Sequence, residues 1–185
     1  MLSVLDSLTK VHHFKRLDDA LSYLQKQQSV YDSMNLIRVK AIVLQYGYPG
    51  KTLVDSPTNE VAFHVLKRYL NRKPSEFSLY LPILKSAAER KEIPFELYAL
   101  VLDQSLFEQG KEQLYGTAMY FIVDAIGSNG MRQPKTIVWP IKDPATVNKR
   151  RKAIGIDKTV EEMAREAKFT YQVYTLKDVK KLVGN

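Results

Sequence analysis

The spacing of apolar residues predicts a chain that is mostly helical. Between residues 17 and 46, apolar side chains recur every three or four positions. This recurrence places side chains on one face of an α-helix. The second half of the pattern consists of Met34, Ile37, Ala41 and Leu44. Gly47 and Pro49 then supply a stop signal, because glycine tolerates a positive φ and proline does not continue a helix. We therefore expect helical structure to end near Tyr46.

Start and stop signals divide the next 60 residues into three more helices. Ser56 before Pro57 is typical of a helix start, and this helix presents Val61, Val65 and Tyr69 on one face. A helix from Ser75 contains Pro82, which predicts either a bend or an early end. A further helix begins at Pro94 and ends at Gly110.

From residue 117 the pattern changes from helical to extended. Two segments rich in β-branched and aromatic residues, 117–126 and 131–141, flank a turn of glycine, serine and asparagine. This order predicts a β-hairpin, and Pro134 predicts that its second strand is an edge strand. A helical segment follows over residues 143–185, where Thr159 and Glu162 have the spacing of a capping box. The expected fold is one mainly α domain, residues 1–185, with a small β-hairpin at about 117–141.

Composition limits the classes of protein and of site. The chain has 185 residues, of which 45% are hydrophobic and 26% charged, as in an ordinary soluble globular domain. It has no cysteine, which excludes disulfides and thiolate metal sites. It also lacks the run of ~20 apolar residues that a membrane span needs. The first 16 residues do not have the pattern of a signal peptide. The compartment stays open between the cytoplasm and export behind a leader that lies outside this sequence.

The net charge of +8 raises the question of an anionic partner. The cations are spread along the chain, and their densest cluster is "NKRRK" at 148–152. We interpret most of them as a solvated basic surface. In the cluster we expect one arginine to be engaged internally and Lys149 and Lys152 to be exposed. Binding of a nucleic acid or another polyanion is the alternative.

The common catalytic signatures are absent. The sequence has no glycine-rich phosphate loop, no Gly-x-Ser-x-Gly elbow and no His-Glu-x-x-His helix. His12 and His13 are adjacent and so point in different directions on a helix, and His64 stands alone. We therefore expect no metal site, no cofactor and no recognisable catalytic residues.

One carboxylate and one short segment are candidates for a site. Asp103 lies in the apolar stretch "LYALVLDQSLF", where a buried carboxylate needs a partner, and an arginine of the basic cluster is an obvious one. The segment "EQLYGT" lies where a helix should end and a strand begin. It is either a structural corner or part of a site for an anionic or carbohydrate-like ligand. The candidate ligand-binding residues are Asp103, Gln113, Tyr115, Thr117, Arg150 and Arg151.

The order of three segments resembles a bacterial domain family of unknown function. These segments are "LQYGYPG", "KEQLYGT" and "DPATVNKRRKAIG", within a match from about residue 30 to 157. The resemblance implies a mainly helical fold and no established activity. In that family a Gln-His-x-Asp segment stands where this chain has residues 67–70, and an Asp-Arg pair stands where it has Asp103 and Gln104. This chain is therefore a poor candidate for any reaction that used those polar groups.

Three hypotheses for the function remain. A non-catalytic ligand-binding or protein-interaction module is favoured, because catalytic signatures are absent, and its partner would be a protein or a small anionic ligand. The first alternative is a hydrolase or transferase of unrecognised type that uses Asp103 with His64 or Tyr115. The second is a binder of nucleic acid or of another polyanion, which requires cations and aromatic side chains to converge on one surface.

Overall fold

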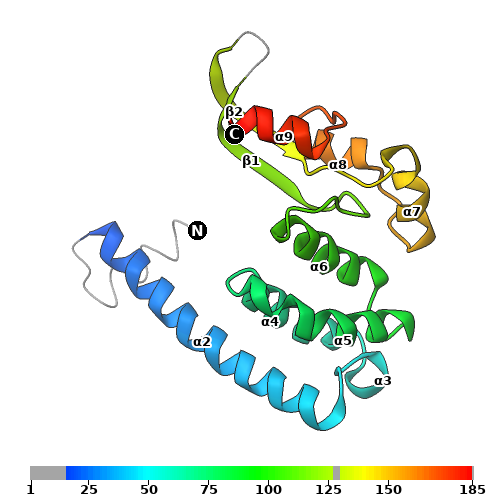
Figure 1. Cartoon of the computed structure of the whole chain (residues 1–185). Helices are drawn as coiled ribbons and strands as arrows, with labels where there is room; N and C mark the ends of the chain where they lie inside the picture. Colours follow the sequence, from blue (N-terminus) through cyan, green and yellow to red (C-terminus); the bar gives the residue numbers. More distant parts are fainter. Residues whose placement is uncertain (1–15, 127–129, 185) are drawn as a thin grey trace.

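A computed structural model of the chain describes residues 16–126 and 130–184, and it confirms a mainly helical fold with one two-stranded hairpin. In Figure 1, α4, α5 and α6 lie beside one another, with α2 along one side and the hairpin and last helices beyond α6. The helices before the hairpin are α2 (Leu17–Tyr46), α3 (Lys51–Val54), α4 (Val61–Leu70), α5 (Phe77–Glu89) and α6 (Phe95–Glu108). The later elements are β1 (Met119–Ile126), β2 (Arg132–Val138), α7 (Val147–Ala153), α8 (Val160–Glu166) and α9 (Leu176–Val183).

Helix α2 is one uninterrupted helix of 30 residues, and it ends at Tyr46 as the sequence predicts. Gly47, with φ +78°, allows the chain to leave the helix. The face packed on the helical core carries Leu36, Val39 and Val43. The apolar spacing predicted a different face, which carries Met34, Ile37, Ala41 and Leu44. This face is exposed to solvent, and Leu44 on it is 90% exposed. Helix α2 therefore has two apolar faces, of which the described residues cover one.

Helix α4 begins later than its start signal predicts. Ser56 lies in a turn, a short 3-10 turn over Thr58–Glu60 follows, and the α-helix starts only at Val61. The fully buried side chains of α4 are Ala62, Phe63, Leu66 and Leu70. The predicted face of α4 is thus not the most buried one, since Val61 is exposed. The reason is that α4 lies between α2 and α6 and buries more than one stripe.

Helices α5 and α6 follow their start and stop signals closely. Helix α5 runs unbroken from Phe77 to Glu89 with Pro82 inside it, so of the two predicted outcomes, a bend or an early end, the early end does not occur. Helix α6 starts directly after Pro94 and ends two residues before Gly110, whose φ is +65°. These helices bury apolar side chains against each other and against α4 in one helical core.

The hairpin has the predicted place and an irregularity at its proline. Strands β1 and β2 pair antiparallel, with Ile122 opposite Lys135 and Ala125 opposite Gln133. Two residues of β1 therefore face one residue of β2, and that residue is Pro134. Because proline has no N–H, the bulge at this position leaves no amide of residue 134 without a partner. Both strands of this two-stranded sheet are edge strands, as expected for β2.

The hairpin and the last helices bury two smaller apolar clusters. Residues of both strands pack on Val179 of α9, and the end of β2 packs on Val147 and Val160. The predicted capping box of Thr159 and Glu162 is present at the start of α8. Among the described residues, none of the helices is both long enough and apolar enough to cross a membrane. The expectation of one domain over the whole chain stays a prediction.

The burial pattern of α4 predicts which of its side chains stabilise the fold. We expect Leu66→Ala to lower the free energy of unfolding by about 3 kcal/mol, because the Leu66 side chain is fully buried. The matched control is Val61→Ala on the exposed side of the same helix, which should change it by less than ~0.5 kcal/mol. Urea denaturation followed by circular dichroism measures both. Equal effects of the two substitutions would contradict the orientation of α4.

Candidate functional site

The corner after α6 is organised by the carboxylate of Asp103. This side chain is 0% exposed, and each of its acceptors is used by the segment that follows the helix. Its Oδ1 accepts from the amide of Leu114 at 2.8 Å and from that of Tyr115 at 3.1 Å. Its Oδ2 accepts from the amide of Thr117 at 3.0 Å and from the Thr117 hydroxyl at 2.9 Å. Four donors within residues 114–117 thus converge on one buried carboxylate.

The two arginines of the basic cluster bind the same segment from the other side. Arg150 Nε donates to the Leu114 carbonyl at 3.0 Å, and Arg151 Nη1 donates to the Tyr115 carbonyl at 2.8 Å. The expected ion pair between Asp103 and one of these arginines is therefore absent from the contacts of the described residues. The main-chain amides of Leu114 and Tyr115 donate to the Asp103 carboxylate. The main-chain carbonyls of the same two residues accept from the two arginines. Both arginines are engaged internally, rather than one, and Lys149 is exposed as expected.

Gln113 ties the corner to the hairpin. Its side chain is fully buried, and its Nε2 donates to the carbonyls of Ala118 at 3.0 Å and Trp139 at 2.7 Å. Its Oε1 accepts from the Ala118 amide at 2.8 Å. Gly116 has φ +68°, and a Cβ there would lie 2.8 Å from Ile141 Cδ1. The segment thus needs glycine both for its conformation and for its close packing.

The electrostatics of the corner follow from its burial. Burial raises the pKa of Asp103, and the hydrogen bonds from the amides of residues 114–117 act in the opposite direction. Burial also raises the pKa of Tyr115, with the nearby charge of Asp103 adding to it. Burial lowers the pKa of Arg151. Since the Asp103 carboxylate, the Gln113 amide and the Thr117 hydroxyl are hydrogen-bonded within the chain, these contacts favour the structural interpretation, and ligand binding by the predicted residues stays a prediction.

A cavity of about 250 Å³ adjoins the corner. Of the predicted site residues, Thr117 lines it. Lys67 of α4, Asn71 just after it and Gln104 of α6 contribute further polar groups, and the remaining lining side chains are apolar. Among the described residues, the Lys67 ammonium contacts no acceptor, whereas the Thr117 hydroxyl donates to Asp103 and the Gln104 amide donates to Glu108. The cavity thus has one cation that is open to a ligand.

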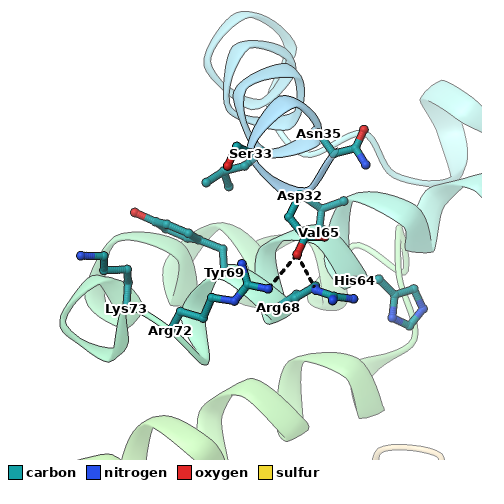
Figure 2. A pocket seen from close by; sticks show the side chains of 10 residues that line it. Asp32, Ser33, Asn35, His64, Val65, Arg68, Tyr69, Arg72 and Lys73 are labelled. Atoms are coloured by element: carbon teal, nitrogen blue, oxygen red, sulfur yellow. Dashed lines mark hydrogen bonds and ion pairs between the residues drawn. The ribbon is translucent and has the colours of Figure 1, made fainter. Parts of the chain in front are cut away.

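A larger groove of about 370 Å³ lies between α2 and α4 (Figure 2). Asp32 of α2 faces Arg68 of α4 and Arg72 of the turn after α4 across it. Arg68 Nε lies 2.8 Å from Asp32 Oδ2, and Arg72 Nη2 lies 2.7 Å from the same oxygen. Both arginine side chains are about half exposed, so the two cations share one carboxylate oxygen at the rim of the groove.

The rest of the groove combines apolar contact with additional positive charge. Leu36 and Val65 form part of the wall, and Lys73 stands at one end with its ammonium exposed. Tyr69 lines the same wall and is held in place by Lys40, whose Nζ lies 4.4 Å from the ring centroid. The Tyr69 hydroxyl donates to Glu76, and this hydrogen bond is the main cause of the raised pKa of Tyr69.

Sequence reasoning did not find this groove. Asp32 and the two arginines are separated by 36 residues or more and belong to no recognised motif. The available signal was the basic segment "KRYLNRK" at 67–73, which contains both arginines.

The structure does not unite the residues of the hydrolase hypothesis. The carboxylate of Asp103 is bonded inside the corner, whereas His64 lies at the groove with its ring edge-on to Phe63 at 5.4 Å. The contact of Tyr115 with Asp103 is made by the Tyr115 main-chain amide, which donates to the carboxylate. Within residues 16–126 and 130–184, no group of three or more potential metal ligands comes together. His12 and His13 lie outside the described residues.

Over the residues that the structure describes, the fold is mainly helical with a β-hairpin, and these sites contain no recognised catalytic centre. A family model described as a family of unknown function (DUF6624) matches residues 14–177, and the chain belongs to this family. Neither a curated protein nor a solved structure matches the chain significantly.

The contacts of Asp103 predict a large effect of a small substitution. Asp103→Asn replaces one acceptor oxygen by an NH₂ group, which would face the donors of residues 114–117. We expect the free energy of unfolding to fall by roughly 3 kcal/mol, since buried donors are left unpaired. Chemical denaturation measures this. The control is Asp157→Asn at an exposed position, for which we expect no change. A stable Asp103→Asn protein would show that the carboxylate is not needed for folding.

The basic cluster separates into structural and surface cations. We expect Arg151→Ala to lower the free energy of unfolding by roughly 2 to 4 kcal/mol, because the Tyr115 carbonyl loses its buried donor. The matched control replaces the exposed Lys149 and Lys152 together by glutamine, and it should change stability by less than ~0.5 kcal/mol. Thermal and urea melts compare the two. A larger effect of the lysine pair would reverse the assignment.

Proposed function

We propose that this chain is a non-catalytic binding module for a small amphipathic anion, which binds in the groove between α2 and α4. The ligand class is a carboxylate or phosphate group on an apolar body. The observation that carries the proposal is the sharing of one Asp32 oxygen by Arg68 and Arg72 beside an apolar wall (Figure 2).

The first argument is that the arginines are held in position before a ligand arrives. Asp32 is the one acceptor that either guanidinium contacts among the described residues, and each contact uses a single nitrogen. Arginine has five N–H donors, so most of them remain available to an incoming anion. Charge-assisted hydrogen bonds from arginine to carboxylate or phosphate are strong and directional. Fixing these side chains in advance reduces the conformational entropy that binding would cost.

The second argument is the balance of charge and apolar surface. Arg68, Arg72 and Lys73 line the groove with Asp32 as the carboxylate among them, which leaves an excess of positive charge. Much of the remaining wall is apolar, with Leu36 and Val65 as examples. Ligand sites are commonly apolar with a few polar groups that fix orientation. A purely ionic ligand would make no contact with this apolar wall, whereas an amphipathic anion would contact both the cations and the wall.

A second candidate site is the cavity beside the corner. It brings Lys67, Gln104 and Thr117 together from three separate segments. Lys67 and Gln104 stand where the resembling family has polar residues, and Thr117 belongs to the predicted ligand-binding set. These observations favour a small anionic or sugar-like ligand there. In that case Asp103, held by the other corner residues, would keep Thr117 in position for the ligand.

The two other hypotheses have less support. An acid or base role for Asp103 would require it to leave the four donors of residues 114–117. Binding of a nucleic acid would use more cations than the groove contains, and it would depend steeply on salt. The groove therefore favours a small ligand over a polymer.

Titrations of the isotopically labelled protein with sodium octanoate, benzoate and inorganic phosphate test the proposal by NMR. We expect octanoate to shift the amide signals of α2 and α4 around Asp32 and Arg68, and to bind more tightly than phosphate, because its chain covers the apolar wall. Replacing Arg68 and Arg72 together by glutamine should weaken octanoate binding at least ~10-fold.

The matched control is Arg90→Gln, which removes one exposed cation away from the groove and should leave binding unchanged. Shifts confined to Lys67, Gln104 and Thr117 would move the site to the second cavity. Salt-sensitive binding of duplex DNA that the arginine substitutions weaken, with no response to the three small anions, would favour the polyanion hypothesis and refute the proposal.

A further inference from the structure

The outer face of α2 is an apolar surface that the described part of the chain leaves uncovered. The side chains of this surface, here called the α2 stripe, are Val30, Met34, Ile37, Ala41 and Leu44. Ile37 is 69% exposed, and the others are also in solvent. The opposite face of the same helix carries the contacts with α4, among them Val39 and Asp32. The stripe is thus not part of the core or of the groove.

The spacing of the α2 stripe is that of a coiled-coil seam. Its members follow one another at intervals of four, three, four and three residues, and no charged side chain interrupts them. A strict repeat of this kind is the pattern by which one helix packs along another, knobs into holes. Exposed contiguous apolar surface of this type marks an interaction site. The partner that the pattern fits best is therefore another helix with the same repeat.

We propose that the α2 stripe is a dimer interface, in which α2 packs antiparallel on α2 of a second copy of this chain. The contact is isologous, so each copy uses the same residues. This inference is independent of the groove, because the stripe and the groove lie on opposite faces of α2.

One register of two antiparallel helices makes the stripe complementary to itself. With the two-fold axis between residues 35 and 36, Met34 faces Ile37 of the second copy. Val30 then faces the small Ala41, and Leu44 at each end of the overlap faces Gln27. The apolar contacts of the seam are therefore the Met34–Ile37 and Val30–Ala41 pairs. The antiparallel arrangement also sets the two helix dipoles against each other favourably.

The same register brings a cation onto an aromatic ring at each flank of the seam. Tyr31 of one copy lies beside Arg38 of the other, and the symmetry repeats this pair. Both side chains are exposed, and neither has a hydrogen bond or an ion pair among the described residues. A guanidinium over a tyrosine ring is attractive. This complementarity favours a second copy over a lipid surface or an unrelated helix.

The size of the surface indicates a reversible dimer. The overlap covers residues 27 to 44, which is about 27 Å of helix. The exposed parts of its apolar side chains amount to on the order of 600 Å² per copy, somewhat below the ~800 Å² of a standard interface. We therefore expect the dimer to dissociate on dilution in the micromolar range.

Sedimentation equilibrium of the full chain tests the interface. We expect a monomer–dimer equilibrium whose association constant falls at least ~10-fold in Ile37→Glu and in Met34→Glu, since each buries a charge in the seam. Both positions are exposed in the monomer, so circular dichroism and the melting temperature should be unchanged at concentrations where the parent is monomeric. The matched control is Leu79→Glu, at an exposed leucine of α5, which should dimerise like the parent. A chain that stays monomeric at high micromolar concentration, or a dimer that both stripe variants leave intact, overturns the proposal.

Engineered cysteines test the direction of the helices, because the chain has no cysteine of its own. A tagged Met34→Cys chain is mixed with an untagged Ile37→Cys chain under a mild oxidant. The antiparallel register predicts a disulfide-linked pair of one tagged and one untagged chain, and little of either homodimer. Efficient disulfides within each variant alone would show parallel helices and overturn the proposed arrangement.

Discussion

The buried carboxylate of Asp103 joins the helical core to the segment that leads into the hairpin. Asp103 lies on a helix of the first core, and its hydrogen bonds hold the amides of the segment that leads into the hairpin. Arg150 and Arg151 hold the carbonyls of that segment from the later helices. A buried carboxylate without donors would be costly, and buried carbonyls without donors would be costly as well. The corner satisfies both demands at once, and the position of the hairpin relative to the helical core depends on it.

The two faces of α2 serve different purposes on this view. The inner face packs on α4 and supplies Asp32, which fixes the arginines of the groove. The outer face repeats apolar residues at coiled-coil spacing and meets no other described element. One helix would therefore connect the proposed ligand site to the proposed dimer interface without sharing side chains between them.

Much of the fold was predictable because its signals are local. The end of α2 at Tyr46, the limits of α6 and the hairpin all follow from glycine, proline and the change of period. The buried face of α4 was not predictable, because a helix that packs between two others buries side chains on more than one of its faces. Asp103 stood out as a carboxylate in an apolar helix. The hydrogen-bond partners of Asp103 were not predictable, since main-chain amides have no sequence signature. The groove was missed because the contact between Asp32 and Arg68 is long-range and belongs to no motif.

The construction of the corner also constrains the order in which the chain acquires structure. The bonds from Arg150 to Leu114 and from Arg151 to Tyr115 each close a loop of 36 residues. Closing a flexible loop of that length costs about 3 kcal/mol of chain entropy. The helical core before the hairpin closes loops of similar length, as between Thr52 and Glu92, which are 40 residues apart. All residues of that core precede Arg150 and Arg151 in the chain, so during synthesis the carbonyls of Leu114 and Tyr115 lack these two donors until the last helices are made.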